Sequence, residues 1–239
     1  SERHASIATL DYKSMTAVQA QTLPQLLKNQ DLIAQAKTGS GKTAAFAIGL
    51  LNKLDQSSYC TQALVLCPTR ELSEQVASEI RRLASTIPNI KLLTLCGGRP
   101  IGPQLTSLQR VPHVVVGTPG RILKHLEKET LQLNTLQTLV LDEADRMLDM
   151  GFHEDIMQII SSTATDRQTL LFSATYPDGI KKISKNVQRE PIDIRVEVDQ
   201  ASPDIEQLFV QMEKSQRFET LYKIIAKYQP KSSLVFCNT

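Results

Sequence analysis

Two short stretches of this sequence carry the residue types that phosphate chemistry requires. Asp142 and Glu143 stand side by side directly after the apolar run Thr138–Leu141. Lys42 and Thr43 close a glycine-containing stretch earlier in the chain. Adjacent carboxylates offer a ligand for a divalent cation and a candidate base, while an ammonium and a hydroxyl bind phosphates and the same cation. Together the two stretches predict hydrolysis of a nucleoside triphosphate with Mg²⁺.

The earlier stretch matches the phosphate-loop pattern G-x-x-x-x-G-K-[ST], except that alanine occupies its first position. It follows an apolar run and precedes a helical pattern over 44–54, a context in which backbone N–H groups point at phosphate oxygens. We expect Lys42 to meet the β- and γ-phosphates and the Thr43 hydroxyl to bind Mg²⁺. A glycine-rich turn with a capping threonine is the alternative. The expected nucleotide-binding residues of the loop are Ala36, Lys37, Thr38, Gly39, Ser40, Gly41, Lys42 and Thr43.

A second nucleotide-related pattern lies behind this loop. Residues Asn52 to Asp55 fit N-K-x-D, which reads guanine in GTP-binding proteins. In those proteins the motif lies on a late strand across the sheet, whereas here it ends the helix that follows the phosphate loop. We therefore expect an exposed helix end and no preference for guanine.

The elements that must position these residues are short apolar runs alternating with helical patterns. The runs are continuous rather than alternating, which is typical of strands that are buried on both faces of a parallel sheet. The sequence therefore predicts an α/β fold, a P-loop domain whose parallel sheet of about seven strands is wrapped by helices. The expected strands are residues 31–35, 62–67, 91–95, 113–116, 138–141, 168–172 and 192–196.

A change of composition near residue 200 predicts a domain boundary. Residues 199–205 are polar and contain a proline, so we expect them to link a first domain, residues 1–198, to a second part, residues 206–239. About 35 residues cannot bury a core of their own, so we expect the chain to end inside a second domain. In this part we expect a strand over 205–212, a helix over 217–228 and a strand over 233–237.

The composition indicates a globular protein. The chain has 239 residues, of which 41% are hydrophobic and 22% charged, and none of its segments approaches the roughly 20 apolar residues of a membrane span. Its first residues do not resemble a secretory signal, so we expect a cytoplasmic location and no membrane partner. The four cysteines show no C-x-x-C pair, which favours buried free thiols over a zinc site or disulfides. A net charge of +2 does not by itself indicate a nucleic-acid binder.

Further blocks, in order along the chain, complete a family resemblance. Together with Asp142-Glu143-Ala144-Asp145 they make the sequence similar to the DEAD-box RNA helicases of superfamily 2, from about residue 11 to the last residue. The amino-acid sequences of several blocks are similar to those of the bacterial DbpA group. The resemblance implies a RecA-like first domain and the start of a second RecA-like domain. The matching blocks are Pro68–Leu72, Gly97–Gly98, Thr118–Arg121, Ser173–Thr175 and Val235–Thr239.

The resemblance also implies roles around the nucleotide. Gln19 would read adenine through its side-chain amide, which makes ATP the expected nucleotide. Glu143 would orient or deprotonate the attacking water, and Asp142 would hold Mg²⁺; a helix-capping pair is the alternative. Asp145 would tie to the Ser173–Thr175 block and couple the ATP site to closure on RNA. The expected catalytic residues are Lys42, Asp142, Glu143, Asp145, Ser173 and Thr175.

The blocks to which the resemblance assigns RNA binding are rich in glycine, hydroxyl groups and arginine. Such groups bind phosphates and sugars, so binding would be largely independent of sequence. Each could instead serve a turn or a helix cap. The basic stretch 181–189 is expected to be a solvated helix face. The expected RNA-binding residues are Thr69, Arg70, Gly97, Gly98, Thr118, Gly120 and Arg121.

The function expected from the resemblance is ATP-dependent local unwinding of RNA duplexes between two RecA-like domains. The arginines that stabilise the transition state would come from the second domain, so we expect this chain alone to be nearly inactive. The alternative is an ATP-gated RNA clamp or remodelling platform. A DNA translocase is less favoured, because its carboxylate motif usually ends in His rather than Asp145. The DbpA resemblance implies ribosomal RNA, during assembly of the large subunit.

Overall fold

The first of two units is built on one parallel sheet. A computed structural model describes residues 14–196, 206 and 208–237, and the chain divides into the units Ser1–Glu197 and Val198–Thr239. The sheet has seven strands in the order β3-β4-β2-β5-β6-β1-β7, all paired in parallel. This confirms the α/β fold with about seven strands. The strands are β1 Leu32–Gln35, β2 Ala63–Leu66, β3 Leu92–Leu95, β4 Val114–Gly117, β5 Thr138–Leu141, β6 Gln168–Ser173 and β7 Ile192–Arg195.

Burial explains why the central strands are continuous apolar runs. Every residue of β2, β4, β5 and β6 is buried, as expected for strands covered on both faces. The edge strands β3 and β7 are only partly buried, and β7 buries a single residue, Ile194. The central strands of the sheet therefore contribute most of the buried core.

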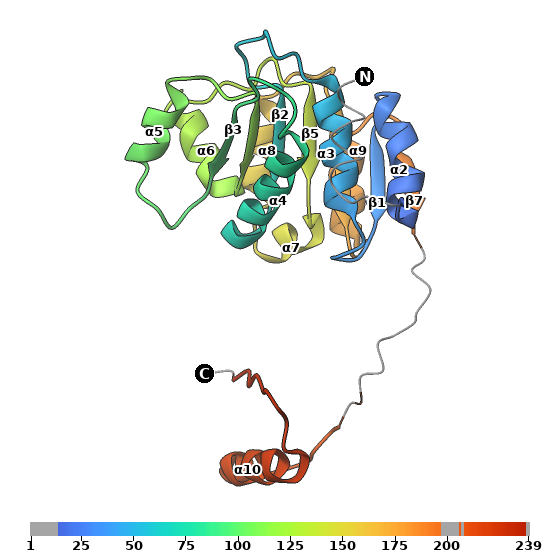
Figure 1. Ribbon diagram of the computed structural model, residues 1–239, viewed down its shortest axis with the longest axis vertical. Helices are drawn as coiled ribbons and strands as arrows, with labels where there is room; N and C mark the ends of the chain where they lie inside the picture. The colour runs from blue at the N-terminus through green and yellow to red at the C-terminus, as the bar shows by residue number, and fades with distance from the viewer. Residues whose placement is uncertain (1–13, 197–205, 207, 238–239) are drawn as a thin grey trace. The chain divides into compact units, whose positions relative to one another are not determined.

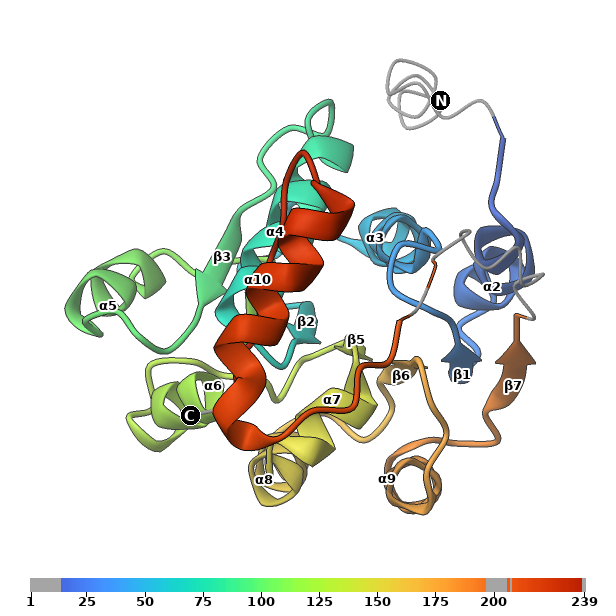
Figure 2. The same cartoon turned by 90° about the horizontal axis from the view of Figure 1, so that it is seen from below.

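Helices cover both faces of the sheet, as the ribbon shows from the side (Figure 1) and along the strands (Figure 2). One core packs beneath α2 Ala17–Leu27, α3 Lys42–Lys53 and α4 Arg70–Leu83. The other packs beneath four further helices, and α5 Gly102–Leu108 lies beside the β3 edge. The four helices are α6 Pro119–Glu127, α7 Ala144–Asp149, α8 His153–Ser161 and α9 Asp178–Val187.

The strand register brings the carboxyl ends of neighbouring strands level. Leu66 pairs with Leu141 on one side and with Gly117 on the other, and Gln35 pairs with Ser173. Gly117 is packed so closely that an added Cβ would lie 2.3 Å from the Leu95 carbonyl oxygen. The loops that follow these strands therefore open at one common edge, here called the carboxyl edge.

The described residues of the second unit contain one α-helix, a short 3₁₀-helix before it, and no strand. The short helix η1 Lys214–Gln216 leads into α10 Arg217–Tyr228, which confirms the helix expected over 217–228. The strands expected over 205–212 and 233–237 are wrong as far as these residues are described. A strand needs a paired neighbour for its backbone hydrogen bonds, and the described residues supply none. The expected linker, residues 199–205, lies outside the described residues.

The described part of the chain has no helix with both the length and the apolar character required to cross a membrane. The four cysteines are free thiols, and Cys67 and Cys96 are buried as expected. Cys60 is only half-buried and Cys237 is exposed, so burial was wrongly predicted for these two. Cys60 lies in the loop before β2, and Cys237 belongs to a segment without a strand partner.

Candidate functional site

The expected site residues gather at the carboxyl edge and divide between its two halves. Those expected to bind nucleotide lie at the ends of β1, β5 and β6, which are neighbours in the sheet, apart from Gln19 on α2. Those expected to bind RNA follow β2, β3 and β4, which are also neighbours. Ligands of open α/β sheets bind outside the carboxyl ends of the strands. The fold therefore brings both expected sites to that edge, with the boundary between β2 and β5.

The phosphate loop connects β1 to α3. Gly39 and Gly41 have φ values of 81° and 89°, which residues with a side chain rarely adopt. A Cβ at Gly41 would also lie 2.7 Å from Gln19 Nε2. Ala36, at the position where the motif has glycine, donates its N–H to the Ser173 carbonyl at 2.9 Å. The first N–H groups of α3, beginning at Lys42, have no intrahelical partner and can bind an anion.

Four side chains of the loop and of the end of β5 face one another. Lys42 Nζ lies 2.8 Å from Asp142 Oδ1 and 3.9 Å from Glu143 Oε1. The Thr38 hydroxyl donates a hydrogen bond to Glu143 Oε1 at 3.0 Å. Burial raises the pKa of Asp142, and the nearby Lys42 ammonium opposes that rise. The phosphate loop and the carboxylates thus form one charged cluster.

The polar atoms of this cluster are incompletely satisfied. Lys42 Nζ lies close to Asp142 without the geometry of a hydrogen bond. Among the described residues, neither Asp142 oxygen nor the Ser40 hydroxyl has a hydrogen-bond partner. Buried carboxylate oxygens without donors suit a hard cation such as Mg²⁺. The described residues contain no group of three or more His, Cys, Asp or Glu side chains that could hold a metal. That fits Mg²⁺, which commonly takes one or two carboxylates with phosphates and waters.

Glu143 has a backbone conformation that is unusual for its type. Its φ of 53° and ψ of 51° are left-handed, and its side chain does not cap α7, which starts one residue later. Arg146 Nη1, on α7, lies 3.4 Å from Glu143 Oε2. The left-handed turn directs the carboxylate to the phosphate loop instead of the helix end. Residues held in such conformations are enriched at functional sites.

Asp145 is bonded to the segment after β6. Its Oδ2 accepts hydrogen bonds from the Thr175 hydroxyl at 2.8 Å and the Thr175 N–H at 2.9 Å. Its own N–H donates to Ser173 Oγ at 3.3 Å. Burial alone would raise the pKa of Asp145, but these hydrogen bonds outweigh it and the pKa is lowered. The carboxylate therefore stays ionised and ties α7 to the end of β6.

Gln19 lies in the first turn of α2, and its side chain contacts the phosphate loop. Its Oε1 accepts the Thr16 N–H at 3.0 Å in a capping box, and its Nε2 donates to the Gly41 carbonyl at 3.2 Å. The amide still has one hydrogen and one lone pair for an adenine, so its expected role stays a prediction. The resemblance begins at about residue 11, and residues 11–13 lie outside the described residues.

The residues expected to bind RNA occupy turns and helix starts. Thr69 caps α4, because its hydroxyl accepts the Leu72 N–H at 3.3 Å, and Arg70 is the first residue of that helix. The Thr118 hydroxyl, at the start of α6, accepts the Gly97 N–H at 3.4 Å. Gly98 has a positive φ of 76°, and Gly120 lies in the first turn of α6. These residues therefore have local roles in turns and helix starts, and their expected contacts with RNA stay a prediction.

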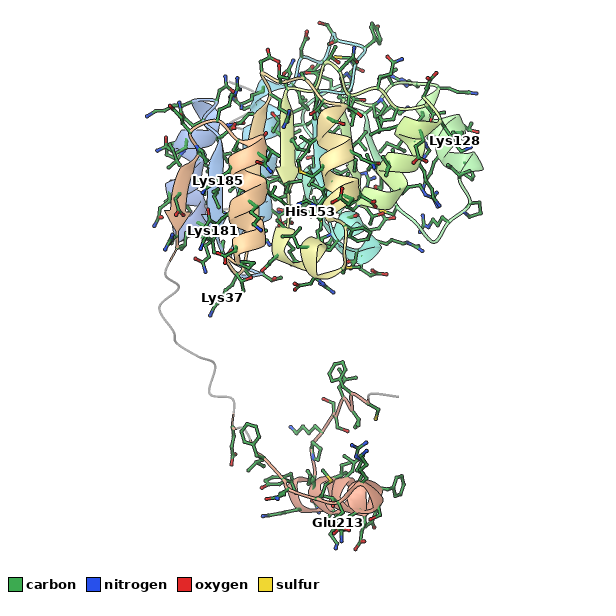
Figure 3. All side chains as sticks on the ribbon, turned by 180° about the vertical axis from the view of Figure 1, so that it is seen from behind. Lys37, Lys128, His153, Lys181, Lys185 and Glu213 are labelled. Atoms are coloured by element: carbon green, nitrogen blue, oxygen red, sulfur yellow. The ribbon has the colours of Figure 1, made fainter. Side chains whose placement is uncertain are left out.

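The structure also describes parts of three other stretches that the sequence analysis singled out. Lys181, Lys182 and Lys185 are exposed along α9, as expected for a solvated face, and Figure 3 shows Lys181 and Lys185 on that helix. Lys53, in the N-K-x-D pattern, ends α3 at the edge opposite the phosphate loop. Asn238 and Thr239, the end of the last matched block, lie outside the described residues.

Some residues of the site region were not predicted from the sequence. Gln104 and His125 form a hydrogen-bonded cluster with Arg121. Gln104 and His125 are 21 positions apart. A short motif carries no signal for a contact of that separation, so only the fold reveals the cluster.

Comparisons with known proteins agree with this geometry. The sequence profile of the DEAD/DEAH box helicase family matches residues 16–183. ATP-dependent RNA helicase DbpA of Escherichia coli (strain K12) is 55% identical over 230 residues, which are 96% of this chain and 50% of that protein. DEAD-box ATP-dependent RNA helicase CshA of Geobacillus kaustophilus is 41% identical over 98% of this chain and 50% of its own length.

The fold has close counterparts among solved structures. A DEAD box protein from the hyperthermophile Methanococcus jannaschii superposes with a TM-score of 0.78 at 38% identity, over 92% of this chain and 60% of that one. The chain thus spans about half the length of the curated relatives it matches. With its phosphate loop, its Asp142–Asp145 tetrad and these relatives, the chain belongs to the DEAD/DEAH box helicase family.

Proposed function

We propose that this chain is the ATP-binding part of an ATP-dependent RNA helicase. The observation that carries the proposal is the approach of Asp142 and Glu143 to Lys42 and Thr38 across the carboxyl edge. The names of the E. coli and Geobacillus relatives support RNA and ATP as ligands. The activity follows from the chemistry that these residues can perform.

The protein groups have distinct roles in the proposed hydrolysis. The loop N–H groups and the Lys42 ammonium bind the phosphates, and Gln19 contacts the adenine. Asp142 and the Thr43 hydroxyl would hold Mg²⁺, which would supply neutralisation of phosphate charge. Glu143 accepts a proton from, or orients, the attacking water, and its left-handed backbone keeps the carboxylate on that side.

The remaining residues connect hydrolysis to RNA. Asp145, held by Ser173 and Thr175, joins the nucleotide half of the edge to the segment after β6. Thr69, Arg70, Gly97, Gly98, Thr118, Gly120 and Arg121 bind the backbone of one RNA strand in the other half. A second RecA-like domain supplies the transition-state arginines and completes both sites. Since the matched relatives are about twice as long, they have room for such a domain.

Strand separation distinguishes the proposal from an ATP-gated RNA clamp. A full-length protein with the second domain should displace a strand from a short RNA duplex when ATP is present. A clamp would retain RNA in the presence of ATP without displacing a strand. ATP hydrolysis stimulated by DNA as strongly as by RNA of the same sequence would contradict an RNA enzyme and favour a DNA translocase.

The finer proposal is a ribosomal RNA substrate, in assembly of the large subunit, as the DbpA resemblance implies. ATP hydrolysis by the full-length protein should then respond more strongly to large-subunit ribosomal RNA than to an unrelated RNA of equal length. Equal stimulation would contradict the ribosomal substrate and leave the helicase proposal intact.

A further inference from the structure

One side-chain amide joins three segments in the RNA-facing half of the carboxyl edge. Gln104 Oε1, on α5, accepts a hydrogen bond from Arg121 Nη1 at 2.9 Å and lies 2.9 Å from His125 Nε2. Gln104 Nε2 donates to the Cys96 carbonyl at 3.1 Å. Cys96 directly precedes Gly97–Gly98. Gln104 therefore links α5, α6 and the glycine loop after β3.

His125 makes a buried contact with that amide, whose orientation is set by Arg121 and by the Cys96 carbonyl. The ring is fully buried, and burial, followed by the charge of Arg121, lowers the pKa of His125. An amide oxygen can only accept, so His125 Nε2 carries the proton of the contact. The other ring nitrogen, Nδ1, lies 2.9 Å from Thr130 Oγ1. A flipped Gln104 amide would place its NH2 group against the Arg121 donor and its oxygen against the Cys96 carbonyl, so a single orientation is stable.

Arg121 is held on both sides by hydrogen bonds to uncharged oxygen atoms. Besides its bond to Gln104, it donates from Nη2 to the Arg99 carbonyl at 2.8 Å. Within the described residues it forms no ion pair with a carboxylate. A guanidinium has five N–H donors, so donors remain for a phosphate. The side chain is half-buried and therefore reaches solvent.

We propose that Gln104 is a positioning residue for binding of the RNA backbone. Through its amide it holds the Arg121 guanidinium and the Gly97–Gly98 loop in one arrangement, to which successive phosphates bind. Gln104 acts through these groups and does not contact the RNA. An ordered arginine loses less side-chain freedom on binding than a mobile one, so the preformed arrangement raises affinity. This inference rests on the proposed RNA function.

Gln104→Met is the variant that tests it. Methionine keeps the length and bulk of the side chain and removes the carbonyl oxygen and the NH2 group of the amide. Gln109→Met is the matched control, since Gln109 lies at the end of the same helix, is exposed and has no side-chain hydrogen bond in the described part of the chain. The measurement is fluorescence anisotropy of a labelled single-stranded RNA at several salt concentrations, with nucleotide binding measured in parallel.

For Gln104→Met we expect about tenfold weaker RNA binding, the effect of freeing one long side chain. The slope of log K against log salt should decrease in magnitude by about 0.7, as for one lost phosphate contact on a single strand. Loss of bulk packing alone would leave the slope unchanged. Gln109→Met should match the unsubstituted chain, and all variants should bind nucleotide equally.

Arg121→Gln is a second test of the proposal, and it leaves the Gln104–His125 contact in place. It should reduce the slope by the same amount, and Gln104→Met should then weaken binding less than it does alone. An unchanged slope in Gln104→Met or in Arg121→Gln would overturn the positioning role and leave the proposed function standing. Failure of the unsubstituted full-length protein, with its second domain, to bind RNA in this assay would overturn both.

Discussion

At the scale of single residues, the nucleotide site combines charge with an unusual backbone. Asp142 is paired in charge with Lys42 but accepts no well-formed hydrogen bond from the described residues, and Glu143 is held in a left-handed conformation at the start of α7. The two neighbouring carboxylates therefore differ in their surroundings. Asp142 is suited to a cation, and Glu143 is suited to a water molecule.

The first prediction concerns Glu143 as the base. In a full-length protein, Glu143→Gln should lower kcat for ATP hydrolysis by about 10²–10⁴-fold, because an amide cannot accept the proton from water. ATP binding should be retained, since the phosphate loop is unchanged. Steady-state ATPase and nucleotide-binding assays measure the two effects. Glu127→Gln, an exposed position on α6, is the control; retained turnover in Glu143→Gln would remove the assignment.

The second prediction concerns Asp145 and pH. Thr175→Val removes the hydroxyl bond to Asp145 but keeps the bond from the Thr175 N–H, so the pKa of Asp145 should rise. We expect a loss of about 1 kcal/mol in the free energy of unfolding at pH 7. The folded pKa of Asp145 lies below its unfolded value, so this contribution is complete above about pH 4 and disappears as the pH falls through the folded pKa.

Urea denaturation at pH 7 and near pH 3 measures that loss. Thr175→Ser keeps the hydroxyl and serves as the control. A difference between valine and threonine that is the same at both pH values would show that the effect is packing and not ionisation of Asp145.

At the scale of elements, full burial made the sheet predictable. The run 138–141 was predicted with the observed bounds of β5, and the other strands differ from their expected runs only at the ends. The predictions of strands over 205–212 and 233–237 were wrong because an apolar composition does not supply a pairing partner. The phosphate loop and the carboxylate pair are local patterns and were predicted. The Gln104–His125 contact and the left-handed Glu143 depend on the fold and could not be.

The third prediction tests the packing of β4 against β3. Gly117→Ala would place a Cβ 2.3 Å from the Leu95 carbonyl oxygen and 2.8 Å from Ile122 Cδ1. The strands must shift, and we expect a loss of about 1–3 kcal/mol in the free energy of unfolding. Urea denaturation measures it, and Gly102→Ala is the control, because an added Cβ there meets no atom within 4 Å. Equal stability of the two variants would contradict the close packing.

At the scale of the whole molecule, the chain provides one complete sheet domain and a second unit whose helix buries no residue. The groups that we assign to ATP all lie on the first unit. In the proposed mechanism, the transition-state arginines do not belong to it.

The fourth prediction follows from that division. The 239-residue chain should bind ATP weakly and hydrolyse it barely, even with RNA, because arginines of this kind raise the rate by about 10³–10⁵-fold. ATPase assays of the chain and of a full-length protein, each with and without RNA, measure the difference. Strong RNA-stimulated turnover by the chain alone would contradict it.

The shared sheet restricts how nucleotide binding can be communicated to RNA. The nucleotide half and the RNA half meet at β2 and β5, which pair from Ala63 with Thr138 to Leu66 with Leu141. Rotation of one half against the other would break this ladder in the middle of the core. In the proposed mechanism this pairing opposes a hinge between the two sites within the domain. Tighter RNA binding after ATP binds would then come from a second body that closes over both halves of the edge at once.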